Sequence, residues 1–148
     1  MTITASGLYG LTLEKMLIDT AGQSLEAETH KVLMVTDTEA PNFDTHDFRN
    51  DILAEVTGTG YTAGGATLTT TEITLASGLL TFDAADVSWA SSTIANAMAA
   101  VGYFNVGTAA TDQLVFLSDF VNAASSSNGT FSIQWSASGI FTVDYTPP

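Results

Sequence analysis

The stretch Gly58-Thr-Gly-Tyr-Thr-Ala-Gly-Gly-Ala-Thr-Leu68 separates a segment with a helical pattern from a long remainder with a strand pattern. It holds four glycines around one aromatic residue. Glycine has no Cβ and adopts positive φ without the steric penalty that other residues incur. The stretch therefore predicts a structural loop of tight turns, in which the tyrosine serves as an anchor. The residues of this loop are Gly58, Gly60, Tyr61, Gly64 and Gly65.

Downstream of the loop, apolar and polar residues alternate with the period of two that is typical of β-strands. Strands are predicted at 94–106 and 114–120, although the Ala-rich middle of the first also fits a helix. The clearest pattern is a hairpin that pairs 131–135 with 141–145, preceded by a turn at Asn128-Gly129. The sequence thus predicts a mainly β protein, an antiparallel β-sandwich or jelly-roll-like fold.

Upstream of the loop, the continuous apolar run of His30 to Val35 predicts a buried strand. We expect one or two short helices besides it. The first covers 11–18, with Thr12 as a candidate N-cap, and the second covers about 46–55, with Thr45 in that role. The second helix is indicated by apolar residues at every fourth position, which lie on one helical face. These residues are Phe48, Ile52 and Val56.

Composition limits the function. The chain has 148 residues, which predicts a single domain spanning 1–148. It has no cysteine, 16 acidic residues and 3 basic ones, for a formal charge of −13. Nucleic acids and anionic membranes bind through clustered Lys and Arg, so we expect neither as a partner. The first residues lack the basic start and apolar run of a signal peptide, and no apolar segment approaches the roughly 20 residues that span a bilayer.

The segment 44–51 combines acidic residues with one arginine and one histidine. Carboxylates and imidazole are metal ligands, but the spacing is not that of a calcium-binding loop. A lone arginine among carboxylates favours ion pairs over a cation site. We therefore predict a structural ion-pair cluster of Arg49 with some of Asp44, Asp47 and Asp51, with no metal or other cofactor.

Catalytic patterns are weak throughout the chain. The glycine-rich loop lacks the Gly-Lys-Ser/Thr ending of a phosphate-binding loop. Two pairs of carboxylates, Asp83 with Asp86 and Asp37 with Glu39, have the residue types of a glycosidase but lie in predicted turns. No nucleophile elbow is present. We predict that the protein is not an enzyme. Four aromatic residues fit either a sugar-binding platform or, as we prefer, a core: Trp89, Trp135, Tyr61 and Tyr103.

Residues 1–9 are β-prone and carry no charged side chain, which is unusual for a solvated tail. We predict an extended N-terminal arm that adds to the sheet edge of another subunit. Ile3, Leu8 and Tyr9 are the candidate assembly contacts. The alternative is that the arm forms the first strand of its own domain.

Three segments are distinctive in combination: Phe43-Asp-Thr-His-Asp-x-Arg-x-Asp, Gly60-Tyr-x-x-Gly-Gly-x-x-Leu68 and Asn128-Gly-Thr-Phe-x-Ile-x-Trp-x-x-x-Gly-Ile-Phe. In this order they resemble small structural proteins that tailed bacteriophages and prophages encode. The resemblance spans most of residues 29–145, and none of its motifs has a known chemical role.

The resemblance implies a virion component, a capsid decoration or cement protein on the outer surface of the head. Its partner would be the major capsid protein or another virion protein, in a homo-oligomer or a multivalent array. Contacts repeated many times need not be strong individually, because multivalency supplies the overall affinity. The alternative is a tail- or fibre-associated module that binds carbohydrate or a host surface.

Overall fold

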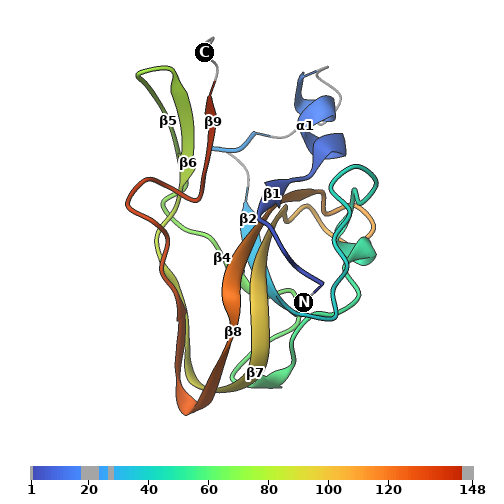
Figure 1. Ribbon diagram of the computed structural model, residues 1–148, viewed down its shortest axis with the longest axis vertical. Helices are drawn as coiled ribbons and strands as arrows, with labels where there is room; N and C mark the ends of the chain where they lie inside the picture. Colours follow the sequence, from blue (N-terminus) through green and yellow to red (C-terminus); the bar gives the residue numbers. More distant parts are fainter. Residues whose placement is uncertain (1, 18–23, 27–28, 145–148) are drawn as a thin grey trace.

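The computed structural model describes residues 2–17, 24–26 and 29–144 (Figure 1). These residues are mainly in antiparallel β-strands, so the predicted fold class is confirmed, and the sheets have a sandwich-like arrangement. In chain order the elements are β1 (Gly7–Leu8), α1 (Gly10–Leu17), β2 (His30–Thr36), the 3-10 turn η1 (Arg49–Asp51), β3 (Gly58–Thr59), β4 (Ala66–Thr67), β5 (Glu72–Ala76), β6 (Leu79–Asp83), β7 (Val87–Phe104), β8 (Leu114–Ile133) and β9 (Phe141–Asp144).

The strands form two sheets. The six-stranded sheet has the order β1-β8-β7-β2-β4, with β3 also paired to β7, and the three-stranded sheet has the order β5-β6-β9. All pairings are antiparallel. The predicted strands at 30–35 and 114–120 lie in β2 and β8. The strand predicted at 94–106 overlaps β7, which ends at Phe104, so the Ala-rich segment is a strand and not a helix.

The hairpin of β7 and β8 dominates the fold because its two strands are 18 and 20 residues long. Both strands bend together, and the six-stranded sheet folds back on itself at the bottom of Figure 1. The bend coincides with several register shifts between the strands. It also holds four non-glycine residues with positive φ: Ser91, Asn96, Val121 and Asn128. Bulges of this kind bend a strand and increase its twist.

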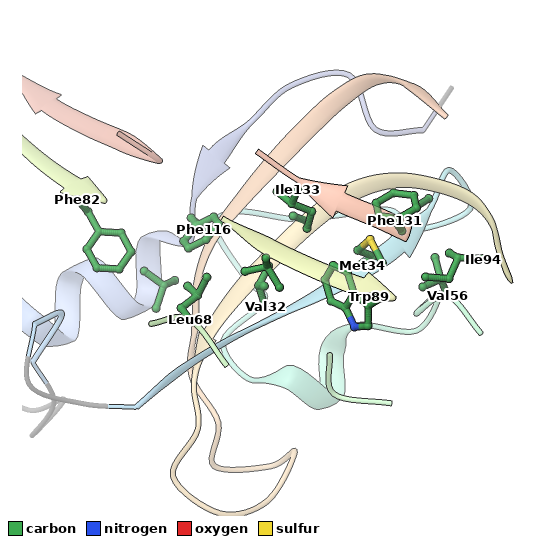
Figure 2. Close-up of a cluster of buried hydrophobic side chains, with 14 of the residues drawn as sticks. Val32, Met34, Val56, Leu68, Phe82, Trp89, Ile94, Phe116, Phe131 and Ile133 are labelled. Atoms are coloured by element: carbon green, nitrogen blue, oxygen red, sulfur yellow. The ribbon is translucent and has the colours of Figure 1, made fainter. Parts of the chain in front are cut away.

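The bend places the two ends of the hairpin on opposite sides of one hydrophobic core. At one end Trp89 pairs with Phe131, and at the other Gly102 pairs with Phe116, whose ring lies in the same cluster. Figure 2 shows Trp89, Phe131 and Ile133 next to Val32 and Met34 of β2. These side chains belong to the larger of two buried clusters. Each fully buried side chain of this size stabilises the fold by roughly 1.5–3 kcal/mol.

The opposite face of β2 is buried as well. Leu33 and Val35 point into a second cluster, with Met98, Val101 and Leu114. Because side chains alternate between the faces of a strand, a strand that is buried on both faces has a continuous apolar run. This explains the sequence of β2.

The N-terminal segment covers the second cluster. Ile3 and Tyr9 are 0% exposed and pack in it, and Gly7–Leu8 pairs with β8 as the edge strand β1. The prediction that Ile3, Leu8 and Tyr9 make assembly contacts is therefore wrong for Ile3 and Tyr9, and Leu8 is half-buried. The β-prone arm adds to the sheet edge of its own domain, which was the alternative. Met1 lies outside the described residues.

The helix predicted at 46–55 is absent, and the segment forms only the 3-10 turn η1. Asp51 N and Ile52 N donate to Phe48 O and Arg49 O within this turn. After it the chain bonds to β2, since Thr36 N donates to Ala54 O and Val56 N donates to Met34 O. Thr45 is accordingly not an N-cap. The helix predicted at 11–18 is present as α1, but it begins at Gly10, so Thr12 lies inside it. Ile18 lies outside the described residues.

The C-terminal hairpin is also not as predicted. Phe131 and Ile133 pair with Trp89 and Val87 of β7, and β9 pairs with β6. Asn128-Gly129 lies within β8, at the bend. The alternating pattern identified the strands correctly but did not determine which partner each strand takes.

Val121 provides a test of the strain at this bend. It has φ of 67°, its side chain is 64% exposed, and its N–H donates to Asp119 Oδ1 at 2.8 Å. A β-branched residue in this region is strained by roughly 1–2 kcal/mol. We expect Val121→Gly to raise the free energy of unfolding by about 1 kcal/mol, measured by chemical denaturation. Ala123→Gly, at an exposed position of β8 without positive φ, should lower it by roughly 0.5–1 kcal/mol. A loss of stability in Val121→Gly would contradict the assignment of strain.

Candidate functional site

The predicted loop lies against the centre of the six-stranded sheet. All four of its glycines have positive φ, at 154° for Gly58, 77° for Gly60, 88° for Gly64 and 70° for Gly65. A Cβ on Gly65 would lie 1.8 Å from Val32 O, far inside van der Waals contact. The loop therefore approaches the β2 backbone at a distance that only glycine permits.

Tyr61 and Glu55 hold this loop in place. The N–H of Met34 donates to Tyr61 Oη at 3.1 Å, and Tyr61 Oη donates to Glu55 Oε1 at 2.8 Å. The same carboxylate oxygen accepts the Gly64 N–H at 2.6 Å. Burial raises the pKa of Tyr61 well above its usual range. The N–H of Met34 opposes this rise, and the Glu55 charge adds to it. The tyrosine predicted as an anchor thus joins the loop to β2.

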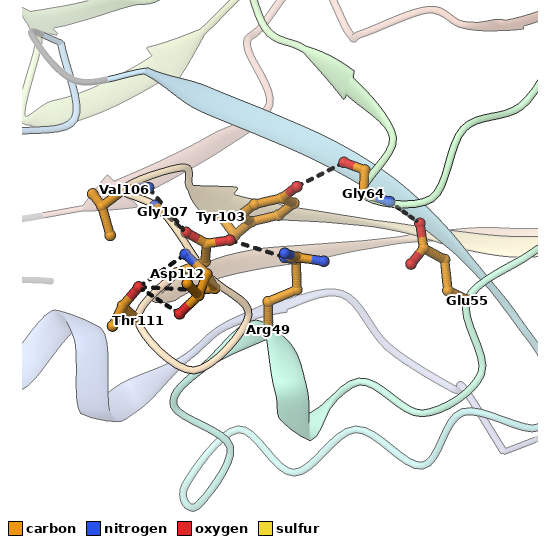
Figure 3. Close-up of polar contacts among 9 residues, drawn as sticks. Arg49, Glu55, Gly64, Tyr103, Val106, Gly107, Thr111 and Asp112 are labelled. Carbon is orange, nitrogen blue, oxygen red and sulfur yellow. Dashed lines mark hydrogen bonds and ion pairs between the residues drawn. The ribbon is translucent and has the colours of Figure 1, made fainter.

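Tyr103 of β7 lies between the loop and the Arg49 guanidinium (Figure 3). Its hydroxyl donates to Gly64 O at 2.7 Å, and the Arg49 guanidinium lies 5.2 Å from its ring centroid. Burial raises the pKa of Tyr103 to about 12, an effect that Arg49 opposes and the negative charges of Asp112 and Glu55 reinforce. The phenol is therefore held in its neutral, donating form.

Arg49 forms its ion pair with Asp112 and not with the neighbouring acids. Arg49 Nε lies 3.0 Å from Asp112 Oδ2, and the Asp112 side chain is 0% exposed. The other carboxylate oxygen accepts the N–H groups of Val106 and Gly107 at 2.9 and 3.1 Å. Asp112 therefore fixes the β7–β8 connection and neutralises the arginine at the same time.

The three acids predicted as partners of Arg49 lie elsewhere. Asp47 Oδ2 is paired with Lys15 of α1. Asp51 Oδ2 accepts the N–H groups of Asp47 and Phe48 at 2.8 and 3.0 Å. Although partial burial opposes its charge, these two N–H groups and His46 hold the pKa of Asp51 below its usual range. Asp44 is exposed. The predicted ion-pair cluster is therefore wrong, because Arg49 pairs with Asp112, which lies 63 residues away in sequence.

The carboxylates considered as catalytic pairs each accept a backbone N–H. Glu39 Oε2 accepts from Leu53 and Ala54 at 2.9 and 2.8 Å. Asp86 Oδ1 accepts from Trp135 N at 2.9 Å. Asp37 and Asp83 likewise accept from Thr2 N and Ala84 N. These carboxylates stabilise turns and loop ends.

The aromatic residues contribute mostly to packing. Trp89 and Tyr103 are 7% and 1% exposed. Tyr61 packs on Trp89 at a centroid distance of 5.7 Å, and Trp135 packs edge-on against Phe116 at 6.0 Å. Trp135 Nε1 donates to Ala85 O at 3.2 Å. Trp89 and Tyr103 therefore belong to the core, and Tyr61 and Trp135 are partly buried against it.

Residues 2–17, 24–26 and 29–144 hold no group of three or more His, Cys, Asp or Glu side chains that could bind a metal ion. Within the same ranges, no helix is long and apolar enough to cross a membrane. His30 is buried in contact with the rings of Phe82 and Phe104 at 5.5 and 4.9 Å. The polar contacts around Tyr61, Tyr103 and Arg49 attach loops to the six-stranded sheet.

Comparison of the chain with protein-family models, with curated proteins and with solved structures found no match. The resemblance to phage structural proteins stays a prediction.

The ion pair predicts a specific loss of stability. In Arg49→Met the fully buried Asp112 carboxylate loses its charged partner, so we expect the free energy of unfolding to fall by ~1–3 kcal/mol. Lys31→Met is the matched control, because Lys31 forms no ion pair with any described residue and its removal changes the net charge equally. If urea denaturation showed the same small change in the free energy of unfolding for both variants, the Arg49–Asp112 pair would contribute nothing to stability.

The close approach of the loop to the β2 backbone predicts a second loss of stability. Gly65→Ala must move the loop away from Val32 O or force alanine into positive φ, and we expect it to cost roughly 1–3 kcal/mol. Gly129→Ala is the control, since a Cβ there meets its nearest atom at 3.7 Å and the backbone is outside the positive-φ region. If thermal melting gave the same temperature for both variants, the glycine requirement at 65 would be refuted.

Proposed function

We propose that the protein is a non-enzymatic structural component of a tailed-phage virion, a capsid decoration or cement protein that binds the outer surface of the head. The proposal rests on the contacts that the motif residues make. In the three segments that resemble phage structural proteins, the characteristic side chains bind polar groups of their own chain or pack in its core. Arg49, Tyr61 and Phe131 are examples from the three segments.

The charge distribution supports the same role. Two of the three cations, Lys15 and Arg49, are paired with carboxylates, so the surface offers no basic cluster for phosphate. Only 13% of the residues are charged, and many of the exposed described residues are Ser, Thr, Ala or Gly. Such a surface suits weak contacts that are repeated over a regular array of subunits.

The alternative, a tail- or fibre-associated module that binds carbohydrate, requires aromatic side chains that are open to a ligand. Trp89 and Tyr103 are buried, and Tyr61 and Trp135 are partly buried against core side chains. The arrangement of the aromatic residues therefore favours the structural role.

Immunogold electron microscopy tests the location. Antibodies raised against the purified protein would be applied to particles from cultures of the host that carries the gene. We expect gold over the heads at many sites per particle, and loss of the label when the gene is deleted. Particles that carry no label, or label confined to the tail, would contradict a decoration protein of the head.

A further inference from the structure

The hairpin of β5 and β6 carries an exposed strand with an apolar side chain in solvent. Four of the five residues of β5 are exposed, and the side chain of Leu75 is 66% exposed. In Figure 1 the hairpin extends toward the upper left, away from the six-stranded sheet. Its turn consists of Ser77 and Gly78, which have positive φ of 52° and 83°. Two such residues form a tight turn that fits the twist of the paired strands.

The outer edge of β5 lacks the features that protect an edge strand. β5 pairs only with β6 among the strands of the described residues. Natural proteins protect such an edge with Lys, Pro, a bulge or a covering segment. The strand Glu72–Ala76 holds neither Lys nor Pro, and its register with β6 is continuous over all five residues. The edge is therefore available to an additional strand.

The turn determines which backbone groups face this edge. In a two-residue hairpin the closing pair, here Ala76 with Leu79, exchanges two hydrogen bonds. Hydrogen-bonded pairs alternate along an antiparallel ladder, so Thr74 belongs to the next one. The N–H and C=O groups of Ile73 and Leu75 consequently face the open edge. An antiparallel strand that pairs there bonds to these two residues.

We propose that this edge binds β5 of a second copy of the chain, antiparallel and with a two-fold axis at Thr74. In this register Ile73 of each copy lies opposite Leu75 of the other. Each of these pairs exchanges two backbone hydrogen bonds, because their N–H and C=O groups face the open edge. Thr74 lies opposite its own counterpart, and cross-strand threonine pairs are favourable. The three-stranded sheets of the two copies thereby become one continuous sheet.

The side chains of β5 are complementary to themselves in this register. Ile73 and Leu75 lie on the same face of the strand, one on each side of Thr74. Ile73 already packs against the larger buried cluster, so the exposed Leu75 of the second copy gains an apolar neighbour there. Glu72, the only charged residue of the strand, lies opposite the neutral Ala76. No like charges therefore meet across the two strands.

The net charge makes the association weak and dependent on salt. Two chains of −13 repel each other, and a five-residue strand buries less surface than a standard stable interface. Salt screens charges that lie farther apart than about 10 Å at 0.1 M ionic strength, whereas the apolar and backbone contacts persist. We expect a dissociation constant on the order of 0.1–1 mM that decreases as salt is added. The pairing follows from the hairpin alone and does not rest on the proposed function.

Sedimentation equilibrium of the full-length protein tests the pairing, over concentrations from about 10 µM to 2 mM. The average mass should rise from monomer toward dimer, and it should do so at lower protein concentration in ~0.5 M than in ~0.1 M sodium chloride. In ¹⁵N-labelled protein, the amide shifts of Ile73 and Leu75 should change with concentration, while that of Val121 on β8 should not.

Leu75→Lys tests the edge itself. Lysine on an edge strand opposes pairing with another strand, so we expect roughly tenfold weaker association. Leu53→Lys is the matched control, because it changes the net charge equally at a side chain that is 87% exposed and outside the hairpin. Both substitutions reduce the net negative charge, so weaker association of Leu75→Lys cannot come from added repulsion. Thermal melting of both variants shows that each is folded.

A cysteine at the two-fold axis tests the register. Opposite residues in a non-hydrogen-bonded pair have Cα atoms about 4.5 Å apart, within the range of a disulfide. The chain has no cysteine of its own. We expect Thr74→Cys to form a disulfide-linked dimer when oxidised by air with copper phenanthroline. Ala123→Cys, at an exposed position of β8, should form far less.

The pairing is overturned if the protein stays monomeric up to ~2 mM, if Leu75→Lys associates as well as Leu53→Lys, or if Thr74→Cys forms no more dimer than Ala123→Cys. Concentration-dependent shifts at other strands, without change at Ile73 and Leu75, would assign the association to another surface and refute it as well. Pairing through β5 together with particles that carry no gold label would keep this inference and reject the decoration protein. Labelled heads with a monomeric protein would do the reverse.

Discussion

The bend shared by β7 and β8 is the constraint on which the rest of the structure depends. At about 3.3 Å per residue, straight strands of this length would extend roughly 60 Å, beyond the dimensions of a compact domain. Because the hairpin bends instead, Trp89 and Phe131 at one end share a buried cluster with Ala100 and Phe116 at the other. Local strain at four positive-φ residues is the cost of burying both ends in one core.

Two buried acids and one half-buried acid have a related role, since they attach irregular segments to this folded sheet. Asp112 holds the β7–β8 connection, Glu39 holds the chain before β3, and Glu55 holds the glycine loop, in each case by accepting backbone N–H groups. A buried N–H without a partner is costly, so loops that leave the sheet ladder need acceptors of this kind. These three acids therefore have a structural role.

The parts of the fold that local pattern determines were predictable, and those that depend on distant partners were not. The apolar run before Thr36 and the alternation after the glycine loop correctly predicted strands, and each glycine of the loop has positive φ. The spacing of Phe48, Ile52 and Val56 suggested a helix, but that backbone bonds to β2 and Glu39. Asp112 escaped prediction because nothing near Arg49 points to it. Its place just before an apolar strand was the only available signal.

Native-state hydrogen exchange tests the central claim, that one bent hairpin forms both sides of the core. The account predicts that amides at Val87–Trp89 and Phe131–Ile133 exchange with the same free energy as those at Ala99–Val101 and Ser118–Asp119, namely that of global unfolding. A contradictory result would be exchange of the first group by local opening, at a free energy well below that of the second. In that case the two ends of the hairpin would be separate units, and the bend would not hold the core together.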